Sequence, residues 1–473
     1  MVSEAGTERE AMMAGDFIVE QIRTPVRYTC DTVVCGGGTA GFVAALAAAR
    51  NGAKTVMVER LGYVGGTLVN GAGPLHSFYN LYKAFPDAKK QQVVQGIPQE
   101  MIERMMAAGG SPGHLEQEKG GSYDSVITIV DWELFKDVAF TMLEEAGVTV
   151  LLHTMIVGVL KDGDQLTGIV TEGKSGREAI RAGVVIDATG DADVAAFAGA
   201  DYEKRQDTTS VGMPFGMNDV DMTRLVEYLK KNNLITQLIE GDKGSETDHV
   251  IRLGFQLNQV PEFTEFMNKE GMWGPLGFSL HENSFTYINS ANLINVDTTN
   301  SEEYSAAEIT LRHQIMQLAA MLKKYIPGFE KSYVSWTPAS IGIRLTRIIT
   351  CEHDMSLEEI VNGRRFKDEV YLYGFHDCAP RITIKEGGCY GVPYRALLPV
   401  KLQGLLLAGR CITSTWEAHM STRNTVSCMA QGQAAGTAAA LCIREGCLPK
   451  ALDVMKLRTT LISQGVYLGQ EDK

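Results

Sequence analysis

The stretch TVVCGGGTAGFVAALAAARNGAKTVMVER, residues 32–60, decides the fold of this chain. An apolar strand pattern at 31–35 leads through three consecutive glycines into an alanine-rich helical pattern at 39–51, and a second strand pattern covers 55–59. Strands that are joined through a helix run parallel, as in a βαβ unit. The stretch therefore predicts an α/β fold around a central parallel sheet.

The glycines of this stretch have the spacing of a dinucleotide-binding turn. Gly36, Gly38 and Gly41 form the pattern G-x-G-x-x-G directly after a strand and at the start of a helix. The first glycine allows the tight bend, the second lets a pyrophosphate approach the backbone, and the third lets helix and strand pack closely. Glu59 ends the second strand, where a carboxylate accepts hydrogen bonds from ribose hydroxyls. A purely structural glycine turn is the alternative interpretation.

The composition of the whole chain excludes several classes of protein. The 473 residues carry a net charge of −13 without a cluster of lysine and arginine, so we expect no nucleic-acid partner and no membrane binding. No segment is apolar for long enough to span a membrane and the N-terminus lacks an apolar signal core, so we expect a cytoplasmic protein. The nine cysteines form no C-x-x-C pair and the histidines have no metal-ligand spacing, so we expect reduced thiols and no metal site.

The pattern of strands and helices changes along the chain. Strand and turn patterns at 148–187 predict an antiparallel meander that returns to a buried strand. Helical patterns at 220–240 and 302–325, with a sheet-like stretch at 284–297 between them, predict an inserted α+β domain. The predicted units are an N-terminal tail at 1–27, a discontinuous nucleotide-binding domain at 28–205 plus 336–460, a substrate-facing insert at 206–335, and a C-terminal tail at 461–473.

Further motifs make the chain resemble a known family. GGT stands at 65–67, the buried strand runs into ATGD at 188–191, and AGR at 408–410 precedes a small-residue helix. From about residue 28 to 470, the chain is similar to the FAD-dependent oxidoreductases that share the glutathione-reductase-like flavin fold, and distantly to the flavoproteins of fumarate reductase and succinate dehydrogenase. The resemblance implies a Rossmann-like FAD/NAD(P)-binding fold with a β-meander, and FAD bound non-covalently.

The resemblance also implies which residues hold the FAD. Those of the pyrophosphate turn are Gly36, Gly38, Thr39, Ala40 and Gly41. Those of the adenosine side are Glu59, Arg60 and Ile156. Those of the phosphate, ribityl and flavin side are Gly190, Asp191, Gly409, Arg410, Gly65, Gly66 and Thr67. The helix that starts near Val426 would direct its positive N-terminal end at the flavin.

Candidates for the substrate side lie between the AGR motif and that helix. The segment TWEAHMSTRNT, 415–425, contains His419 and Arg423, which converge if the segment is helical. Arginine can anchor a carboxylate and histidine can move a proton. Fumarate-reductase relatives have a similar His-to-Arg spacing, although the rest of their H-G-x-N-R-x-G-G signature is absent here. The apolar stretch IGIRLTRIIT adds Arg344 and Arg347, for which a structural salt bridge is the alternative.

The sequence therefore predicts an FAD-dependent oxidoreductase that exchanges a hydride between flavin N5 and a small polar or anionic substrate, with dehydrogenation of a C–OH or C–N centre favoured. A fumarate-reductase-like C=C reductase, an electron-transfer flavoprotein and a non-catalytic scaffold are the alternatives. No second G-x-G-x-x-G follows a strand, so we expect no separate NAD(P)H domain. Electrons would then pass through the substrate or through an external donor or acceptor, and a homo-oligomer is compatible with the sequence.

Overall fold

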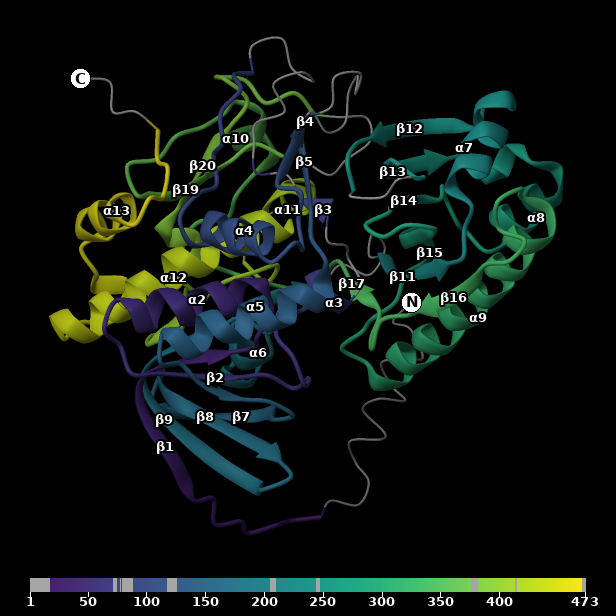
Figure 1. Cartoon of the computed structure of the whole chain (residues 1–473). Coiled ribbons are helices and arrows are strands. Elements are labelled where there is room, and N and C mark those ends of the chain that lie inside the picture. The colour runs from purple at the N-terminus through teal and green to yellow at the C-terminus, as the bar shows by residue number, and fades with distance from the viewer. Residues whose placement is uncertain are drawn as a thin grey trace, which may run out of the picture.

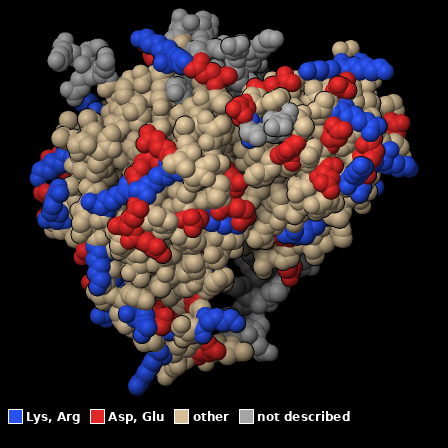
Figure 2. All heavy atoms as spheres, in the orientation of Figure 1, with Lys and Arg blue, Asp and Glu red and all other residues tan. Residues whose placement is uncertain are grey.

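The computed structural model contains two large sheets, each with its own hydrophobic core (Figure 1). The structure describes residues 18–70, 75–76, 78, 88–116, 126–204, 210–243, 247–375, 382–412 and 415–469. The first sheet and its helices occupy the left of Figure 1 and the second sheet the right. On the face shown in Figure 2, acidic and basic side chains are interspersed.

Five strands of the first sheet run parallel, in the order β6-β2-β1-β9 with β21 also beside β9. Their bounds are β1 Val26–Cys35, β2 Thr55–Val58, β6 Thr149–Leu151, β9 Gly176–Asp187 and β21 Leu405–Leu407. The last residues of β1, β2, β9 and β21 are buried and mostly apolar, as expected for strands of a parallel sheet. The predicted parallel α/β fold is confirmed.

The predicted meander is also present, at the bottom of Figure 1. Strands β7 (Met155–Asp162) and β8 (Gln165–Gly173) pair antiparallel, and β8 pairs antiparallel with β9. The turns between these strands contain Gly163 and Gly176, which both have positive φ. Glycine adopts this conformation without steric cost, and this allows the tight reversals.

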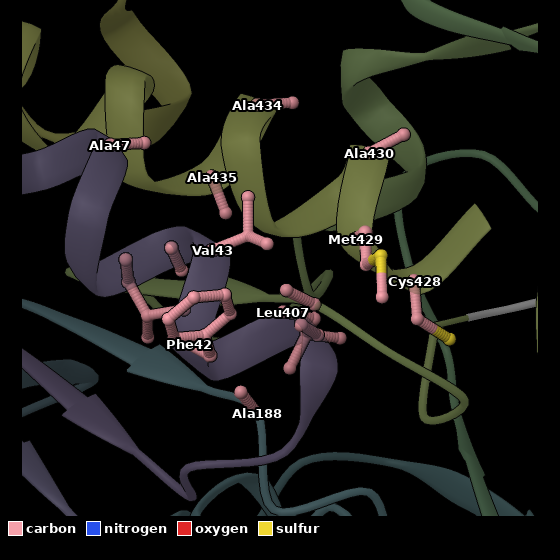
Figure 3. Packing of buried hydrophobic residues seen from close by; sticks show 14 of the residues in the cluster. Phe42, Val43, Ala47, Ala188, Leu407, Cys428, Met429, Ala430, Ala434 and Ala435 are labelled. Atoms are coloured by element: carbon pink, nitrogen blue, oxygen red, sulfur yellow. The ribbon is translucent and has the colours of Figure 1, made fainter. Parts of the chain in front are cut away.

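The two helices next to the glycine turn pack unusually closely. Helix α2 (Thr39–Arg50) and helix α12 (Thr425–Glu445) meet through alanine, glycine and other small side chains (Figure 3). A Cβ atom on Gly432 would lie 2.1 Å from the carbonyl oxygen of Ala40, and one on Gly436 would lie 2.1 Å from that of Ala44. The small residues of α12 therefore let two backbones approach, and they hold the N-terminal ends of both helices near one another.

The second sheet is antiparallel, with the order β12-β13-β14-β15-β11-β16 and β17 also beside β11. The bounds are β11 Ser210–Asn218, β12 Ile235–Glu240, β13 Val250–Phe255, β14 Leu276–Phe278, β15 Ser284–Ile294, β16 Tyr333–Trp336 and β17 Gly342–Ile343. The helices of this region are α7 Met222–Lys231, α8 Pro261–Lys269 and α9 Ser301–Tyr325. The expectation of mixed helix and sheet in the insert agrees with these elements.

One helix in the insert is shorter than predicted. The helical pattern at 220–240 predicts one helix, but α7 ends at Lys231 and β12 begins at Ile235. Asn233 between them has a φ of 53°, a left-handed conformation that ends a helix and that asparagine tolerates. The following sequence ITQLIE is rich in β-branched residues and pairs with β13.

The boundaries of the structural units differ from those predicted, while the division into domains stays a prediction. Strand β1 already begins at Val26, inside the predicted N-terminal tail. Strands β16 and β17 pair with β11, so the second sheet extends beyond residue 335. Helix α13 (Val454–Ser463) crosses residue 460, and its Leu461 is buried in the core of the first sheet.

The remaining elements surround these two sheets. The other strands are β3 Leu75–His76, β4 His114–Glu116, β5 Val126–Ile129, β10 Tyr202–Lys204, β18 Arg347–Ile349, β19 Glu369–Tyr373 and β20 Tyr390–Pro393. The other helices are α3 Thr67–Asn70, α4 Ile97–Ala107, α5 Trp132–Glu145, α6 Asp193–Ala198, α10 Leu357–Val361 and α11 Trp416–Thr422. None of the helices in the described ranges has the length and apolarity needed to cross a membrane.

Candidate active site

A cleft of about 800 Å³ opens where four parallel strands end. The residues that follow β1, β2, β9 and β21, which include Gly36, Glu59, Ala188 and Gly409, all line it. Ligands of open α/β sheets bind in this position, beyond the carboxyl ends of the strands. The predicted cofactor residues that line the cleft are Gly36, Gly38, Thr39, Ala40, Glu59, Arg60, Gly66, Thr67, Gly190, Asp191, Gly409 and Arg410.

The glycines of the turn differ in why a side chain is excluded at each position. Gly36 has a φ of 96°, and a Cβ there would lie 2.6 Å from the carbonyl oxygen of Ala188. A Cβ on Gly41 would lie 1.8 Å from the carbonyl oxygen of Gly36. Around Gly38, by contrast, the nearest atom to a Cβ would be the Cα of Gly66 at 3.9 Å. The protein itself requires Gly36 and Gly41, whereas at Gly38 a side chain would fill only the cleft.

The N-terminus of α2 supports the same interpretation. Gly38 is the N-cap, it makes no side-chain cap, and the first turn of the helix carries no acidic residue. Exposed N–H groups and the positive end of the helix dipole favour an anion such as a pyrophosphate. The empty space beside Gly38 and the bare helix end therefore fit the phosphates of FAD.

Glu59 follows β2 and lines the cleft beside the glycine turn. Its carboxylate accepts hydrogen bonds from the backbone N–H groups of Gly37 at 2.6 Å and Leu61 at 2.8 Å. Burial raises the pKa of Glu59, while these two N–H groups and nearby Arg60 oppose the rise. Each oxygen accepts one of these bonds and has a second lone pair for a ribose hydroxyl.

Asp191 and Arg410, which also line the cleft, form an ion pair. The Arg410 Nη2 atom lies 2.6 Å from Asp191 Oδ1, and both side chains are largely buried. The hydroxyl of Thr346 donates to the same oxygen at 2.7 Å, and Arg410 Nη1 donates to that hydroxyl at 3.2 Å. A Cβ on Gly190, which has a φ of 80°, would lie 3.1 Å from the guanidinium. This cluster fixes the shape of the cleft wall.

A buried aspartate that the sequence interpretation missed supports this wall from below. Asp187 is fully buried at the end of β9. It accepts hydrogen bonds from the N–H and hydroxyl of Thr189 at 3.0 and 2.7 Å, and from the N–H of Ala195 at 2.9 Å. Burial raises its pKa to about 6. Three donors hold the turn at 188–191, and an acid that ends an apolar strand was the available signal.

Three predicted cofactor residues do not line the cleft. Gly41 packs under Gly36, and Gly65 donates its N–H to the carbonyl of Gly37 at 2.8 Å. Ile156 lies in β7 and packs against the core of the first sheet. Gly41 and Gly65 shape the turn from behind, and the predicted contact of Ile156 with adenine stays a prediction.

The structure places only one of the three predicted catalytic residues among the residues that line the cleft. Arg423 lines the cleft at the end of α11, just before α12. His419 is fully buried, and its Nε2 lies 3.2 Å from the carbonyl oxygen of Arg344. Because a carbonyl only accepts, this ring nitrogen carries the proton. Only Arg423 of the three is among the cleft residues, and the catalytic roles of all three stay predictions.

Other polar residues near these segments have structural partners. Arg347 forms an ion pair with Asp193 at 2.8 Å, which agrees with the salt-bridge interpretation. Outside the cleft, Arg395 pairs with Asp368 at 2.8 Å.

Residues that the sequence interpretation missed complete the cleft. Cleft residues without a prediction include Leu61, Asn70, Ala188, Thr189, Ser340, Ile341, Ile343, Thr425 and Cys428. Ser340, Ile341 and Ile343 belong to the second sheet or its approach, so the insert contributes to the wall. Asn70 is buried and accepts a hydrogen bond from the hydroxyl of Tyr63. Local signals existed for Ala188 and Thr189, which belong to the ATGD motif, for Asn70, which follows GGT closely, and for Thr425 and Cys428, which start α12.

Comparisons with curated proteins find partial relatives among flavin enzymes. Urocanate reductase of Eggerthella lenta is 29% identical over 146 residues, which are 30% of this chain and 22% of that protein. Digeranylgeranylglycerophospholipid reductase of Methanocaldococcus jannaschii is 27% identical over 177 residues, which are 37% of this chain and 42% of that protein. Fumarate reductase (cytochrome) of Shewanella frigidimarina is 33% identical over 107 residues, which are 22% of this chain and 17% of that protein. The chain covers less than half the length of each of these relatives.

Two further comparisons extend over a longer range of the chain. A geranylgeranyl bacteriochlorophyll reductase-like protein of Thermoplasma acidophilum superposes with a TM-score of 0.48 at 15% identity, covering 93% of this chain and 84% of that protein. A family model described as FAD dependent oxidoreductase matches residues 31–461, which is most of the chain. This chain therefore belongs to the FAD-dependent oxidoreductase family, and it is an oxidoreductase that uses FAD.

Proposed function

We propose that the chain holds FAD non-covalently in the cleft and exchanges a hydride with a small polar or anionic organic substrate. The α2 N-terminus and the space beside Gly38 would receive the pyrophosphate. Glu59 would accept hydrogen bonds from the adenosine ribose. Bound FAD supplies the two-electron redox chemistry, and the remaining work of the site is to position the substrate and exclude water.

The location of Arg423 carries the proposal for the substrate. Arg410 in the same cleft is engaged by Asp191 at 2.6 Å, so its charge is largely balanced within the protein. Arg423 lines the cleft where the N-terminus of α12 opens, next to Thr425. An arginine there can hold a carboxylate by two parallel hydrogen bonds. The apolar Ile341 on the insert side would cover the rest of a small molecule.

His419 and Arg344 are linked to Arg423 by a chain of contacts. The N–H of Arg423 donates to the carbonyl of His419 at 3.1 Å, and His419 in turn contacts the Arg344 carbonyl. We propose that this chain of contacts sets the position of Arg423 and that His419 is the candidate for moving a proton. Dehydrogenation of a C–OH or C–N centre stays the favoured reaction.

Reduction of an activated carbon–carbon double bond is the second candidate. The relatives named urocanate reductase and fumarate reductase favour it, because both names describe reduction of an unsaturated carboxylate. Transfer of electrons to or from a redox partner is the third. In each case the electron donor or acceptor would be external, because the sequence shows a single dinucleotide turn.

An anaerobic screen tests this function. The purified protein is mixed with hydroxy acids, amino acids, sugars and amines, and loss of the oxidised flavin absorbance is recorded. The dithionite-reduced protein is mixed with unsaturated carboxylates, and return of the absorbance is recorded. We expect one anionic or strongly polar class to react. Reaction with a redox protein but with no small molecule would overturn the proposal.

A further inference from the structure

A buried glutamine lies directly behind the cleft. Gln431 is on α12 and its side chain is fully buried, although the surrounding helix consists largely of alanine and glycine. A buried amide loses free energy unless its polar atoms find partners. An apolar side chain would fit this helix at a lower desolvation cost. The amide therefore needs an explanation from its contacts.

The contacts of Gln431 join three separate segments. Its Oε1 accepts a hydrogen bond from the N–H of Gly409 at 2.7 Å. Its Nε2 donates one N–H to the carbonyl of Thr422 at 2.8 Å, and the hydroxyls of Tyr371 at 3.1 Å and Ser427 at 3.3 Å compete for its second N–H. The Tyr371 and Ser427 hydroxyls lie 2.8 Å apart, so they also bond to each other.

Two of these contacts fix the orientation of the amide. The N–H of Gly409 can only donate, so it must face the Gln431 oxygen. The carbonyl of Thr422 can only accept, so it must face the Gln431 nitrogen. The side chain therefore holds the two backbones in one relative position, and a flipped amide would lose both bonds.

Both backbones lead directly into the cleft. Gly409 lines the cleft beside Arg410, and its φ of 112° restricts this position to glycine. Thr422 immediately precedes Arg423, which also lines the cleft. One buried side chain thus ties the turn on the cofactor side to the arginine on the substrate side.

We propose that Gln431 is a positioning residue of the active site, which sets the Gly409 turn for the cofactor and the Thr422 backbone for Arg423. The cofactor part of this proposal depends only on the cleft binding FAD. The part that concerns Arg423 rests on the proposed function. The two parts have separate readouts below.

Gln433 provides a matched control on the same helix. Its side chain is also buried, and its Oε1 accepts a hydrogen bond from the N–H of Ile97 at 2.9 Å. Ile97 begins α4, and neither residue lines the cleft. Gln431→Met and Gln433→Met each remove one buried amide and one bond to a backbone N–H. Gln431→Met also removes the bonds of Nε2, whereas the Nε2 atom of Gln433 has no partner among the described residues, so Gln431→Met should cost more folding stability and the FAD affinity of the folded variants decides.

The experiment measures FAD dissociation from the full chain. Apoproteins of wild type, Gln431→Met and Gln433→Met are titrated with FAD, and the melting temperature and flavin midpoint potential are recorded. We expect both variants to melt at a lower temperature. Only Gln431→Met should weaken FAD binding, by about tenfold, and shift the potential. Equal FAD affinity and potential in the two variants would overturn the proposal.

Gln431→Glu adds a test by pH. A protonated carboxyl can accept from Gly409 and donate to Thr422, as the amide does, whereas a carboxylate places an oxygen against the Thr422 carbonyl. We expect the FAD affinity of this variant, relative to wild type, to recover toward acid pH. An affinity ratio that is independent of pH would count against the orientation argument.

Two further measurements complete the design. If Gln431→Met does not fold, Tyr371→Phe removes one partner of Gln431 and should weaken FAD binding by a smaller factor. Unchanged binding would overturn the proposal.

Malonate, titrated into the flavin-loaded proteins and followed by the flavin spectrum, probes Arg423. Gln431→Met should weaken malonate binding relative to Gln433→Met. If malonate does not bind the wild type, the proposed anionic substrate fails, and the FAD readout still decides the role of Gln431.

Discussion

The two walls of the cleft are built in opposite ways. The wall of the glycine turn comes from neighbouring stretches at 36–41 and 59–67, and backbone and missing side chains dominate it. The other wall combines 188–191, 340–343, 409–410 and 423–428, and buried side-chain hydrogen bonds hold it together. One wall depends on missing side chains within short stretches of the sequence. The other depends on contacts between segments that are far apart in the sequence.

This difference has a functional consequence. A wall of backbone N–H groups and helix ends binds phosphate without regard to what reacts nearby. A wall assembled from separate segments can change its side chains without disturbing the turn. We therefore expect one wall to bind the cofactor and substrate choice to depend on the other. The predictions below test each wall, starting with the largest effect.

Gly41→Ala should damage the glycine wall most. Its Cβ would meet the Gly36 carbonyl oxygen at 1.8 Å, and backbone atoms cannot move aside. We expect the free energy of unfolding to fall by more than about 3 kcal/mol, with loss of FAD. Thermal unfolding of the apoprotein measures this. An apoprotein as stable as the wild type would show that the turn can relax, and that Gly41 is not required for packing.

Gly38→Leu should separate cofactor binding from folding. No protein atom lies within 3.9 Å of a Cβ at this position, and its φ of −62° suits any residue. The apoprotein should lose only about 1 kcal/mol, since leucine is a poorer N-cap than glycine. FAD binding should weaken at least about a hundredfold, because the side chain occupies the phosphate site. Retention of FAD by this variant would move the pyrophosphate away from the turn.

Arg423→Ala tests the second wall. Loss of a buried charged hydrogen bond costs roughly 1.5–3 kcal/mol, which is about ten- to a hundredfold in kcat/KM. FAD content should stay the same, and Arg423→Lys should recover part of the activity because it keeps the charge. Arg395→Ala is the control, because Arg395 pairs with Asp368 and lies outside the cleft. If Arg423→Ala loses FAD instead, the arginine belongs to the cofactor site.

How much could be predicted from the sequence follows the same division. The glycine turn, the strands beside it and the meander depend on periodicity and glycine spacing within each segment, so the sequence pattern was sufficient to predict them. The wall around Arg423 depends on which segments a buried hydrogen bond joins, such as Gln431 with Gly409. No spacing in the sequence indicates such a partner across 22 residues.

The errors have equally specific reasons. The helix predicted at 220–240 ignored a left-handed Asn233, which the apolar pattern alone does not reveal. The role of His419 as a proton carrier, by contrast, stays a prediction, and the structure places its buried ring against the Arg344 carbonyl. Ile341 and Ile343 looked like ordinary core residues, and only the path of β17 brings them to the cleft. The residue type predicts which chemistry a side chain can perform, whereas tertiary contacts determine whether the side chain reaches the cleft.

The smallest expected effect concerns the contact between the two sheets. His281, in the second-sheet region, lies with its Nε2 3.3 Å from Asp131 Oδ2 at the start of α5. The hydrogen bond to Asp131 raises the pKa of His281, although burial and nearby Lys243 oppose the rise. Trp132 and Trp336 pack beside this contact with ring centroids 4.4 Å apart. The ion pair is therefore a pH-sensitive addition to an apolar junction.

The sign of the pH dependence follows from the raised pKa. A histidine with a raised folded pKa contributes stability that is fully present below its unfolded pKa of 6.5 and is lost as pH rises through the folded value. The imidazole is 64% exposed, so solvent screening limits the contribution to about 0.5 kcal/mol or less. We expect His281→Gln to lower the free energy of unfolding by this amount at pH 6 and by almost nothing at pH 9, measured in urea. His313→Gln, on α9, removes one histidine elsewhere in the insert and serves as the control. An equal loss at both pH values would mean that packing around Trp132, and not the charge pair, stabilises the contact between the two sheets.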